Sequence, residues 1–301
     1  MTFLLRHRPA GILRVSGLDA PAFLQGQFTN ELAQDIGSVR YGLFLNQKGR
    51  VVADAWALRL TENEFFLVSY FSAGVVIKQR LEDYIVADDV IVVDESAPLG
   101  GLAIWGADCE ARLEEALGLL PPSGKFVRSG NSLVFAGRRA TARNYEILGP
   151  ETDIRELHEK LRALGSETVD MNQAEYVRIA DGIPAIPQDI GPGDLPNEGD
   201  LDETAISYTK GCYLGQEVMA RLKNMGQIRR RLHVLRGAGK PPENRAMLYQ
   251  GDKKVGEIRS AASQGGEFAA LAMLSLLHLD QAWDLSLGPN EALTLKISPR
   301  G

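Results

Sequence analysis

The sequence predicts an α+β protein of more than one domain that ends in a small antiparallel β-barrel. With 301 residues and 45% hydrophobic composition, the chain can bury more than one core, since a domain takes roughly 150 residues. Patterns typical of a hairpin, a long helix and a strand follow one another twice, around 56–94 and around 132–170. After residue 231, short strands alternate with turns rich in Gly, Pro and Asn, which is typical of a small barrel.

The first half of the chain begins with an alternating strand pattern and a helix near Pro21, which Asp19 is placed to cap. Ser72 is a candidate N-cap for the helix expected over 73–84. Another helix begins near Asp108, and we expect its Cys109 to be an inert, small side chain. Strands are expected at 41–46, 51–60, 65–70, 88–94 and 101–106.

The second half repeats this order and then departs from it. A hairpin at 132–148 precedes a helix over 154–164 and a further helix over 172–181. Residues 182–204 combine prolines and glycines with isoleucines that favour burial, so we expect an ordered, irregular and functional segment there. The C-terminal barrel is expected to begin near 236.

Composition excludes several classes of function. A net charge of −6 and a pI near 5.4 argue against a dedicated nucleic-acid binder, which needs an excess of Lys and Arg. No apolar run reaches the ~20 residues that span a bilayer, so we expect a cytoplasmic protein without a membrane segment. Two distant cysteines and scattered histidines predict no metal site built by the protein.

The segment Thr209–Arg231, TKGCYLGQEVMARLKNMGQIRRR, is the least typical of a packed core. Cys212 lies there among glycines and basic residues, which favour a reactive thiolate. However, no histidine lies within twenty residues to act as its base, and a lone cysteine in such a segment is more often buried than reactive. The composition leaves both interpretations open.

Acidic residues at 189–203 precede basic residues at 210–231. A ligand with a heterocyclic donor face and an anionic tail would suit this order, with a carboxylate at one end and arginines at the other. The alternative is two solvated, charged faces. Likewise, Gln27 and Asn30 are either ligand-facing amides or the cap and turn residues that end a helix.

KGCYLGQE at 210–217 resembles the signature K-G-C-[FY]-x-G-Q-E of the YgfZ-type folate-binding proteins. These are relatives of the glycine-cleavage T-protein, an aminomethyltransferase, and are implicated in iron–sulfur cluster assembly or maintenance. VSGLDAPAFLQGQFTNEL and LPNEGDLDETAISYTKGC also resemble segments of this family. The resemblance covers most of the chain.

The resemblance implies a three-domain cloverleaf, in which two ferredoxin-like α/β units and the C-terminal antiparallel β-barrel surround a central channel. In it, 1–46 and 130–235 would form the folate-binding domain that carries the motif. Residues 47–129 would form a second α/β domain, and 236–301 the barrel. The channel would bind tetrahydrofolate or a one-carbon derivative.

The resemblance also assigns residues. Glu198 would accept hydrogen bonds from the pterin, with Asp54, Gln27 and Asn30 also at the folate and Arg221 near its glutamyl tail. Cys212 would lie at the channel edge as the reactive thiol. The signature residues expected to shape its surroundings are Lys210, Gly211, Cys212, Tyr213, Gly215, Gln216 and Glu217.

The function implied is that of a folate-binding accessory protein that meets iron–sulfur client or assembly proteins. A transferase of the T-protein class is the alternative enzyme. It is disfavoured because Ala53 and Ala180 stand where T-proteins have acidic residues. A scaffold that docks iron–sulfur proteins without catalysis is the third alternative, and catalytic turnover is left open.

Overall fold

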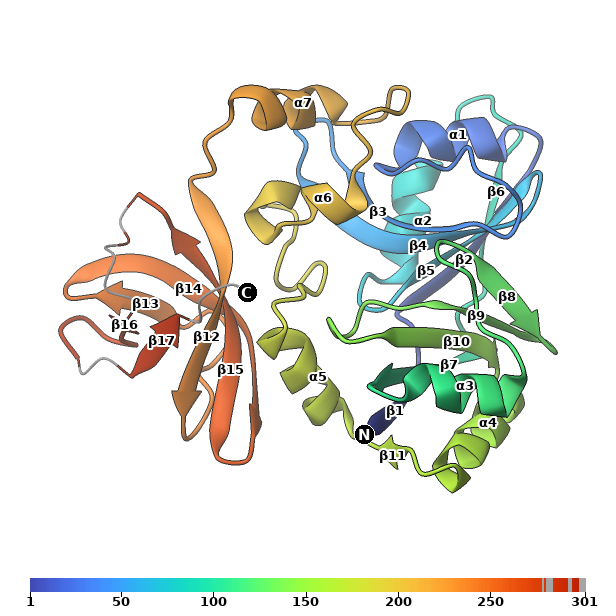
Figure 1. The fold of residues 1–301 in the computed structure, drawn as a ribbon. Helices are drawn as coiled ribbons and strands as arrows, with labels where there is room; N and C mark the ends of the chain where they lie inside the picture. Colours follow the sequence, from blue (N-terminus) through green and yellow to red (C-terminus); the bar gives the residue numbers. More distant parts are fainter. Residues whose placement is uncertain (278, 280–283, 292–293, 298–301) are drawn as a thin grey trace.

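The computed structural model describes residues 1–277, 279, 284–291 and 294–297. Within these ranges the chain forms three β-sheets, of which two pack against each other and the third forms the C-terminal barrel (Figure 1). Between the barrel and the paired sheets lie helices α5 (Met171–Ala180), α6 (Asp202–Ala205) and α7 (Gln216–Met225). None of the helices in the described ranges has both the length and the apolar character of a membrane span.

Sheet I has the strand order β3–β4–β5–β2–β6. Its outer face is covered by α1 (Ala20–Gln27) and α2 (Gly74–Glu82), which pack on buried side chains such as Phe28 and Phe65. Its strands are β2 (Gly11–Ser16), β3 (Val39–Leu45), β4 (Val51–Thr61), β5 (Glu64–Ser69) and β6 (Ile91–Asp94).

Sheet II has the strand order β11–β1–β7–β10–β9–β8. Helices α3 (Cys109–Leu117) and α4 (Glu151–Ala163) cover its outer face, and Ile154 and Leu161 of α4 are buried there as the helical spacing predicts. Its strands are β1 (Thr2–His7), β7 (Leu99–Gly106), β8 (Phe126–Ser129), β9 (Ser132–Ala136), β10 (Asn144–Pro150) and β11 (Glu167–Thr168).

The inner faces of the two sheets form a shared core. Ile12 and Phe66 of sheet I pack in one cluster with Phe135 and Leu148 of sheet II. Burying a side chain of this size stabilises a fold by about 1.5–3 kcal/mol. The two sheets therefore form one layered body with helices on both outer sides.

The repeated order of elements is confirmed. The first repeat, β4–β5–α2–β6, lies in sheet I, and the second, β9–β10–α4–β11, lies in sheet II. The sheets do not follow the predicted division of 1–46 plus 130–235 from 47–129. A boundary at 46/47 falls in the turn of the β3–β4 hairpin, and one at 129/130 falls in the turn of the β8–β9 hairpin.

The irregular segment 182–204 is ordered, as its buried isoleucines predict. Ile186 and Ile190 pack in one core cluster with Leu43 of sheet I and Leu271 of the barrel. The segment contains the 3-10 helix η1 (Pro196–Gly199). It therefore joins the paired sheets to the barrel through a common apolar core.

The barrel sheet has the order β13–β14–β15–β12–β17–β16, and a bridge between Tyr249 and Ser286 brings its end strands together. It begins at Arg230 rather than at 236, because β12 pairs with β15 from Arg230 onward. Residues 292–293 of the expected last strand lie outside the described residues. The strands are β12 (Arg230–Ala238), β13 (Met247–Gln250), β14 (Lys253–Gln264), β15 (Glu267–Ser275), β16 (Asp284–Leu285) and β17 (Leu295–Ile297).

Candidate functional site

Lys210 attaches the signature loop, residues 210–217, to the end of α1. Its buried ammonium donates to the backbone carbonyls of Gln25 (2.8 Å), Phe28 (2.7 Å) and Asn30 (2.9 Å). Burial lowers the pKa of Lys210 to about 8, so the ammonium, which has one N–H for each carbonyl, is the main form at neutral pH. This lysine therefore fixes the position of the loop.

The other side of the loop is fastened as well. The amide of Leu214 donates to the carbonyl of Gly26 (3.1 Å), and the side chain of Gln216 accepts from the amide of Tyr213 (3.3 Å). Gly215 has φ of 87°, and a Cβ there would lie 2.8 Å from the carbonyl oxygen of Asn46. Only glycine allows α7 to begin this close to the β3–β4 turn.

Cys212 lies exposed between these two attachments. Its neighbours differ in exposure: Gly211 and Glu217 are exposed, whereas Tyr213 is buried. The thiol has no hydrogen-bond partner in the described part of the chain. Cys109, in contrast, is buried and donates to the carbonyl of Arg143 (3.2 Å), and burial raises the pKa of its thiol, as expected for an inert cysteine.

Asp54, on β4, is buried among hydroxyl groups. Its carboxylate accepts hydrogen bonds from Tyr41 (2.9 Å), Ser69 (2.8 Å) and Ser72 (2.8 Å). Ser72 does not cap α2. Its hydroxyl lies instead 2.9 Å from the carbonyl of Ile186, so the Asp54 cluster links sheet I to the irregular segment.

Arg138 reaches this cluster from the β9–β10 connection in sheet II. Its guanidinium lies 4.2 Å from the ring centre of Tyr41 and donates to the Tyr41 hydroxyl (2.7 Å). Burial and the Asp54 carboxylate raise the pKa of Tyr41, although Arg138 acts in the opposite direction. Tyr41 therefore remains a phenol that donates to Asp54.

Glu198, in η1, is buried and already paired. Arg230 on β12 donates to both of its carboxylate oxygens, through Nε (3.0 Å) and Nη2 (2.9 Å). The amide of Leu195 donates a third hydrogen bond (2.9 Å). Glu198 thus accepts three hydrogen bonds within the protein, which uses most of its acceptor capacity, and its expected role as an acceptor for the pterin stays a prediction.

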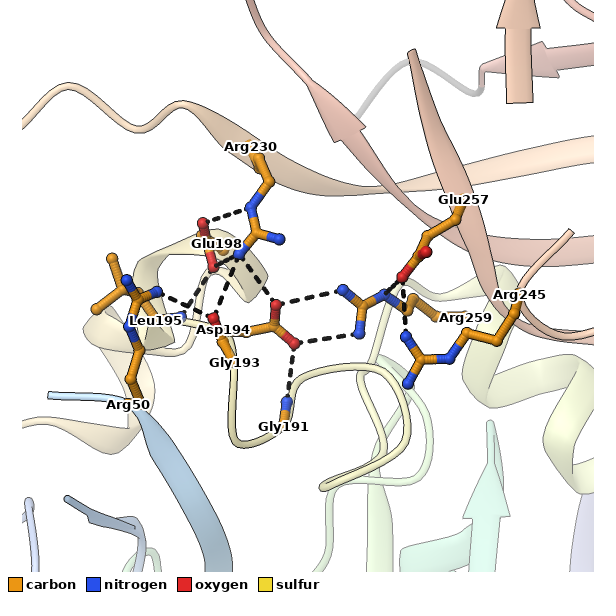
Figure 2. Close-up of polar contacts among 10 residues, drawn as sticks. All are labelled: Arg50, Gly191, Gly193, Asp194, Leu195, Glu198, Arg230, Arg245, Glu257 and Arg259. Carbon is orange, nitrogen blue, oxygen red and sulfur yellow. Dashed lines mark hydrogen bonds and ion pairs between the residues drawn. The ribbon is translucent and has the colours of Figure 1, made fainter. Parts of the chain in front are cut away.

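Asp194 continues this network into the barrel (Figure 2). It accepts from Arg230 (3.1 Å) and from both terminal nitrogens of Arg259 on β14 (3.2 Å each). Beyond Arg259, Glu257 lies between that arginine and Arg245. The network connects the segment that carries Glu198 to two barrel strands.

A cavity of about 670 Å³ opens beside the Glu198–Arg230 pair. Three arginines line it, namely Arg50, Arg229 and Arg230, together with the apolar side chains of Leu195, Leu222 and Ile228. Arg50 is held in place by a hydrogen bond to the carbonyl of Gly193 (3.0 Å). Arg221, which was expected near an anionic tail, is exposed on α7 and does not line this cavity.

The two amides expected at the ligand are engaged by the protein. Gln27 accepts from Arg80 (3.0 Å). Asn30 donates to the carbonyl of Tyr41 (2.9 Å) and accepts from the amide of Glu31 (2.8 Å), which is turn chemistry. Asn30 lies beyond the C-cap of α1 at Phe28 and shapes the turn that follows, as in the alternative interpretation.

The predicted residues thus form three separate places: the loop of Cys212, the cluster of Asp54 and the cavity at Glu198. Sequence reasoning missed Arg50, Arg138 and Arg230 as individual contributors. The Arg229–Arg231 run signalled a basic end, but only the β12 register shows which of these arginines faces Glu198. Among the described residues, no group of three or more His, Cys, Asp or Glu side chains is placed to hold a metal ion.

Two family models match the chain. The GCVT N-terminal domain matches residues 8–210, and the CAF17 C-terminal beta-barrel domain matches residues 229–299. The second match begins one residue before β12, in agreement with a barrel that starts at Arg230.

Two curated proteins resemble this chain in sequence, and a solved structure resembles it in fold. The chain is 29% identical to the iron-sulfur cluster assembly factor IBA57, mitochondrial, of Homo sapiens, over 86% of this chain and 74% of that protein. It is 29% identical to the tRNA-modifying protein YgfZ of Edwardsiella ictaluri (strain 93-146), over 95% of this chain and 89% of that protein. The crystal structure of glycine cleavage system aminomethyltransferase T from Bartonella henselae superposes with a TM-score of 0.81 at 20% identity, over 99% and 85% of the two chains. The predicted α+β fold with a C-terminal barrel is confirmed.

Proposed function

The chain belongs to the GCVT N-terminal domain family, as a YgfZ-type relative of the aminomethyltransferase, and we propose that it is a tetrahydrofolate-binding accessory protein for iron–sulfur cluster assembly or maintenance. Relatives named for iron–sulfur cluster assembly and for tRNA modification match most of its length. These names support a role for this chain in iron–sulfur cluster assembly or in tRNA modification.

The observation that carries the proposal is the cavity lined by arginines beside Glu198. Its volume of about 670 Å³ lies within the roughly 300–1,000 Å³ common for small-molecule sites. Arg50 and Arg229 offer charge for the carboxylates of a glutamyl tail, and Leu195 and Leu222 offer apolar walls for a ring. The residues present therefore fit a folate.

Bound tetrahydrofolate would supply ring nitrogens that carry one-carbon units. The residues of this chain would bind and orient it, with the arginines at its anionic end. Asp54 does not line this cavity and already accepts hydrogen bonds from three hydroxyl groups, so its expected place at the folate stays a prediction. Ala53 and Ala180, at positions where T-proteins have acidic residues, favour the accessory role over aminomethyl transfer.

Cys212 is proposed as the group that meets the iron–sulfur partner. Its exposure, together with the attachments at Lys210 and Leu214, presents one thiol at a defined place on the surface. From Gln216 to Leu222, α7 advances roughly 9 Å, at 1.5 Å per residue. The helix thus links the thiol loop to the cavity wall.

Calorimetric titration with 5-formyltetrahydrofolate, a stable reduced folate, tests the proposal. We expect binding to the wild type and weaker binding to Arg229→Gln. Lys48→Met removes an exposed charge outside the cavity and serves as the control, with unchanged affinity. If the wild type does not bind the reduced folate, the folate proposal is wrong.

A second experiment separates the thiol from the folate site. We expect Cys212→Ala to keep its stability and folate affinity but to lower the activity of an iron–sulfur enzyme in cells that lack the wild-type chain. Cys109→Ala removes the buried thiol and should keep that activity if it folds. Full rescue by Cys212→Ala would reduce Cys212 to a surface residue without a role.

A further inference from the structure

A second cavity of about 510 Å³ adjoins the first. Asn197, Leu222 and Ile228 line both cavities, so these three side chains form the partition between them. A ligand longer than one cavity would pass over this partition. Folates are elongated molecules with chemically different ends, so the charges that line each cavity indicate which end it suits.

The cavities differ in charge. The first contains Arg50, Arg229 and Arg230, whereas the second contains the carboxylates of Asp202 and Glu203. The one cation of the second cavity, Lys223, lies 3.8 Å from the ring centre of Tyr208. The first cavity therefore suits the anionic end of a ligand, and the second suits an end that donates hydrogen bonds.

Asn197 presents an unpaired acceptor in the partition. Its Nδ2 donates to the carboxylate of Asp202 (2.7 Å), and a carboxylate can only accept, so the orientation of the amide is determined. Its carbonyl oxygen, Oδ1, is buried and has no hydrogen-bond partner among the described residues. An unpaired buried acceptor is costly, and a donor from a ligand or a water would remove that cost.

The neighbouring Glu198 is a poorer candidate for the same task. It already accepts two hydrogen bonds from Arg230 and one from the amide of Leu195. The acceptor that is still available in this segment is the Oδ1 atom of Asn197, the residue before Glu198.

We infer that Asn197 is a ligand-binding residue whose Oδ1 accepts a hydrogen bond from the amino or N–H edge of the pterin, in the second cavity, while the arginines of the first cavity hold the glutamyl end. This inference rests on the proposed folate binding and adds the direction in which the ligand lies. It also makes Asn197 a determinant of specificity for the heterocycle.

Two variants separate this role from a structural one. Asn197→Leu removes both the N–H that binds Asp202 and the acceptor oxygen, whereas Asn197→Gln keeps both groups on a side chain one methylene longer. By titration, we expect Asn197→Leu to bind 5-formyltetrahydrofolate about tenfold more weakly, the effect of one lost hydrogen bond. Asn197→Gln should stay within about threefold of the wild type.

The direction of the ligand is tested with p-aminobenzoyl-glutamate, which lacks the pterin. Its affinity should be unchanged in Asn197→Leu and reduced in Arg229→Gln. Equal losses for the leucine and glutamine variants would make Asn197 a structural residue. Loss of p-aminobenzoyl-glutamate binding in Asn197→Leu would reverse the direction. Both results overturn the inference while leaving folate binding intact, whereas a wild type that binds no reduced folate overturns the proposed function too.

Discussion

Lys210 and Phe28, 182 residues apart in the chain, are joined by a buried hydrogen bond of 2.7 Å from the lysine ammonium to the phenylalanine carbonyl. Phe28 is the C-cap residue of α1, where carbonyl groups lack partners within the helix. A cation at this end of a helix also complements its dipole. The signature lysine therefore connects the thiol loop to the first helix of the protein.

Lys210→Met should lower the free energy of unfolding by about 2 kcal/mol, because it leaves three carbonyls without their charged donor. Methionine keeps the apolar stem, so the loss reports on the ammonium. Urea denaturation measures it. Lys48→Met, at an exposed turn, should change stability by less than about 0.5 kcal/mol. Equal stability of the two variants would show that the Lys210 ammonium contributes nothing.

Two glycines of the signature should respond differently to alanine. Gly215→Ala should cost at least about 2 kcal/mol, because it needs a left-handed φ and its Cβ would meet the carbonyl of Asn46. A Cβ on Gly211 would have no atom within 4 Å, so Gly211→Ala should be tolerated. Thermal denaturation of the two variants checks this, and a destabilised Gly211→Ala would contradict the geometry.

The network of Asp194 should hold the barrel to the central segment. Asp194→Asn removes a buried charge that Arg230 and Arg259 share, and we expect a loss of about 3 kcal/mol in urea denaturation. Glu257→Gln changes a partly exposed member of the same network and should cost less than about 1 kcal/mol. If Asp194→Asn is as stable as the wild type, the network does not contribute to the fold.

Acid should destabilise the protein through its buried histidines. Burial and the guanidinium of Arg139 lower the pKa of His7, although Glu146 opposes them, and the ring of Tyr70 packs edge-on against it. The folded state thus keeps His7 neutral, whereas the unfolded chain takes up a proton below about pH 6.5. The free energy of unfolding therefore falls as the pH drops through this range, by at most about 1.4 kcal/mol per pH unit for one proton.

His7→Gln should make that dependence shallower between pH 5 and 6.5, as measured by urea denaturation at each pH. Some dependence should remain, because burial also lowers the pKa of His158 and His233. A slope in the variant equal to that of the wild type would show that His7 is protonated in the folded state.

Local sequence patterns predicted the helices and strands more accurately than they predicted the side-chain contacts. The helices near Pro21 and over 73–84 exist. Asp19 occupies the N-cap position of the first, as predicted, but its side chain makes no capping hydrogen bond, and Ser72 lies one residue before the N-cap of the second. Asp19 accepts instead from the amide of Asp89 (2.8 Å), and Ser72 binds Asp54. Capping residues are recognised by their neighbours in sequence, whereas these two side chains found partners brought close by folding.

The sequence by itself determined the α+β class, the two hairpin–helix–strand units, the barrel and the signature around Cys212, because hydrophobic periodicity and turn residues act over short distances. Only the tertiary structure decided which strands share a sheet, that Lys210 binds the end of α1, and that Glu198 is paired with Arg230 while Asn197 is not satisfied. The contact of Lys210 joins groups 182 residues apart and that of Glu198 joins groups 32 residues apart, and no local pattern records which distant partner a strand or a charge will meet.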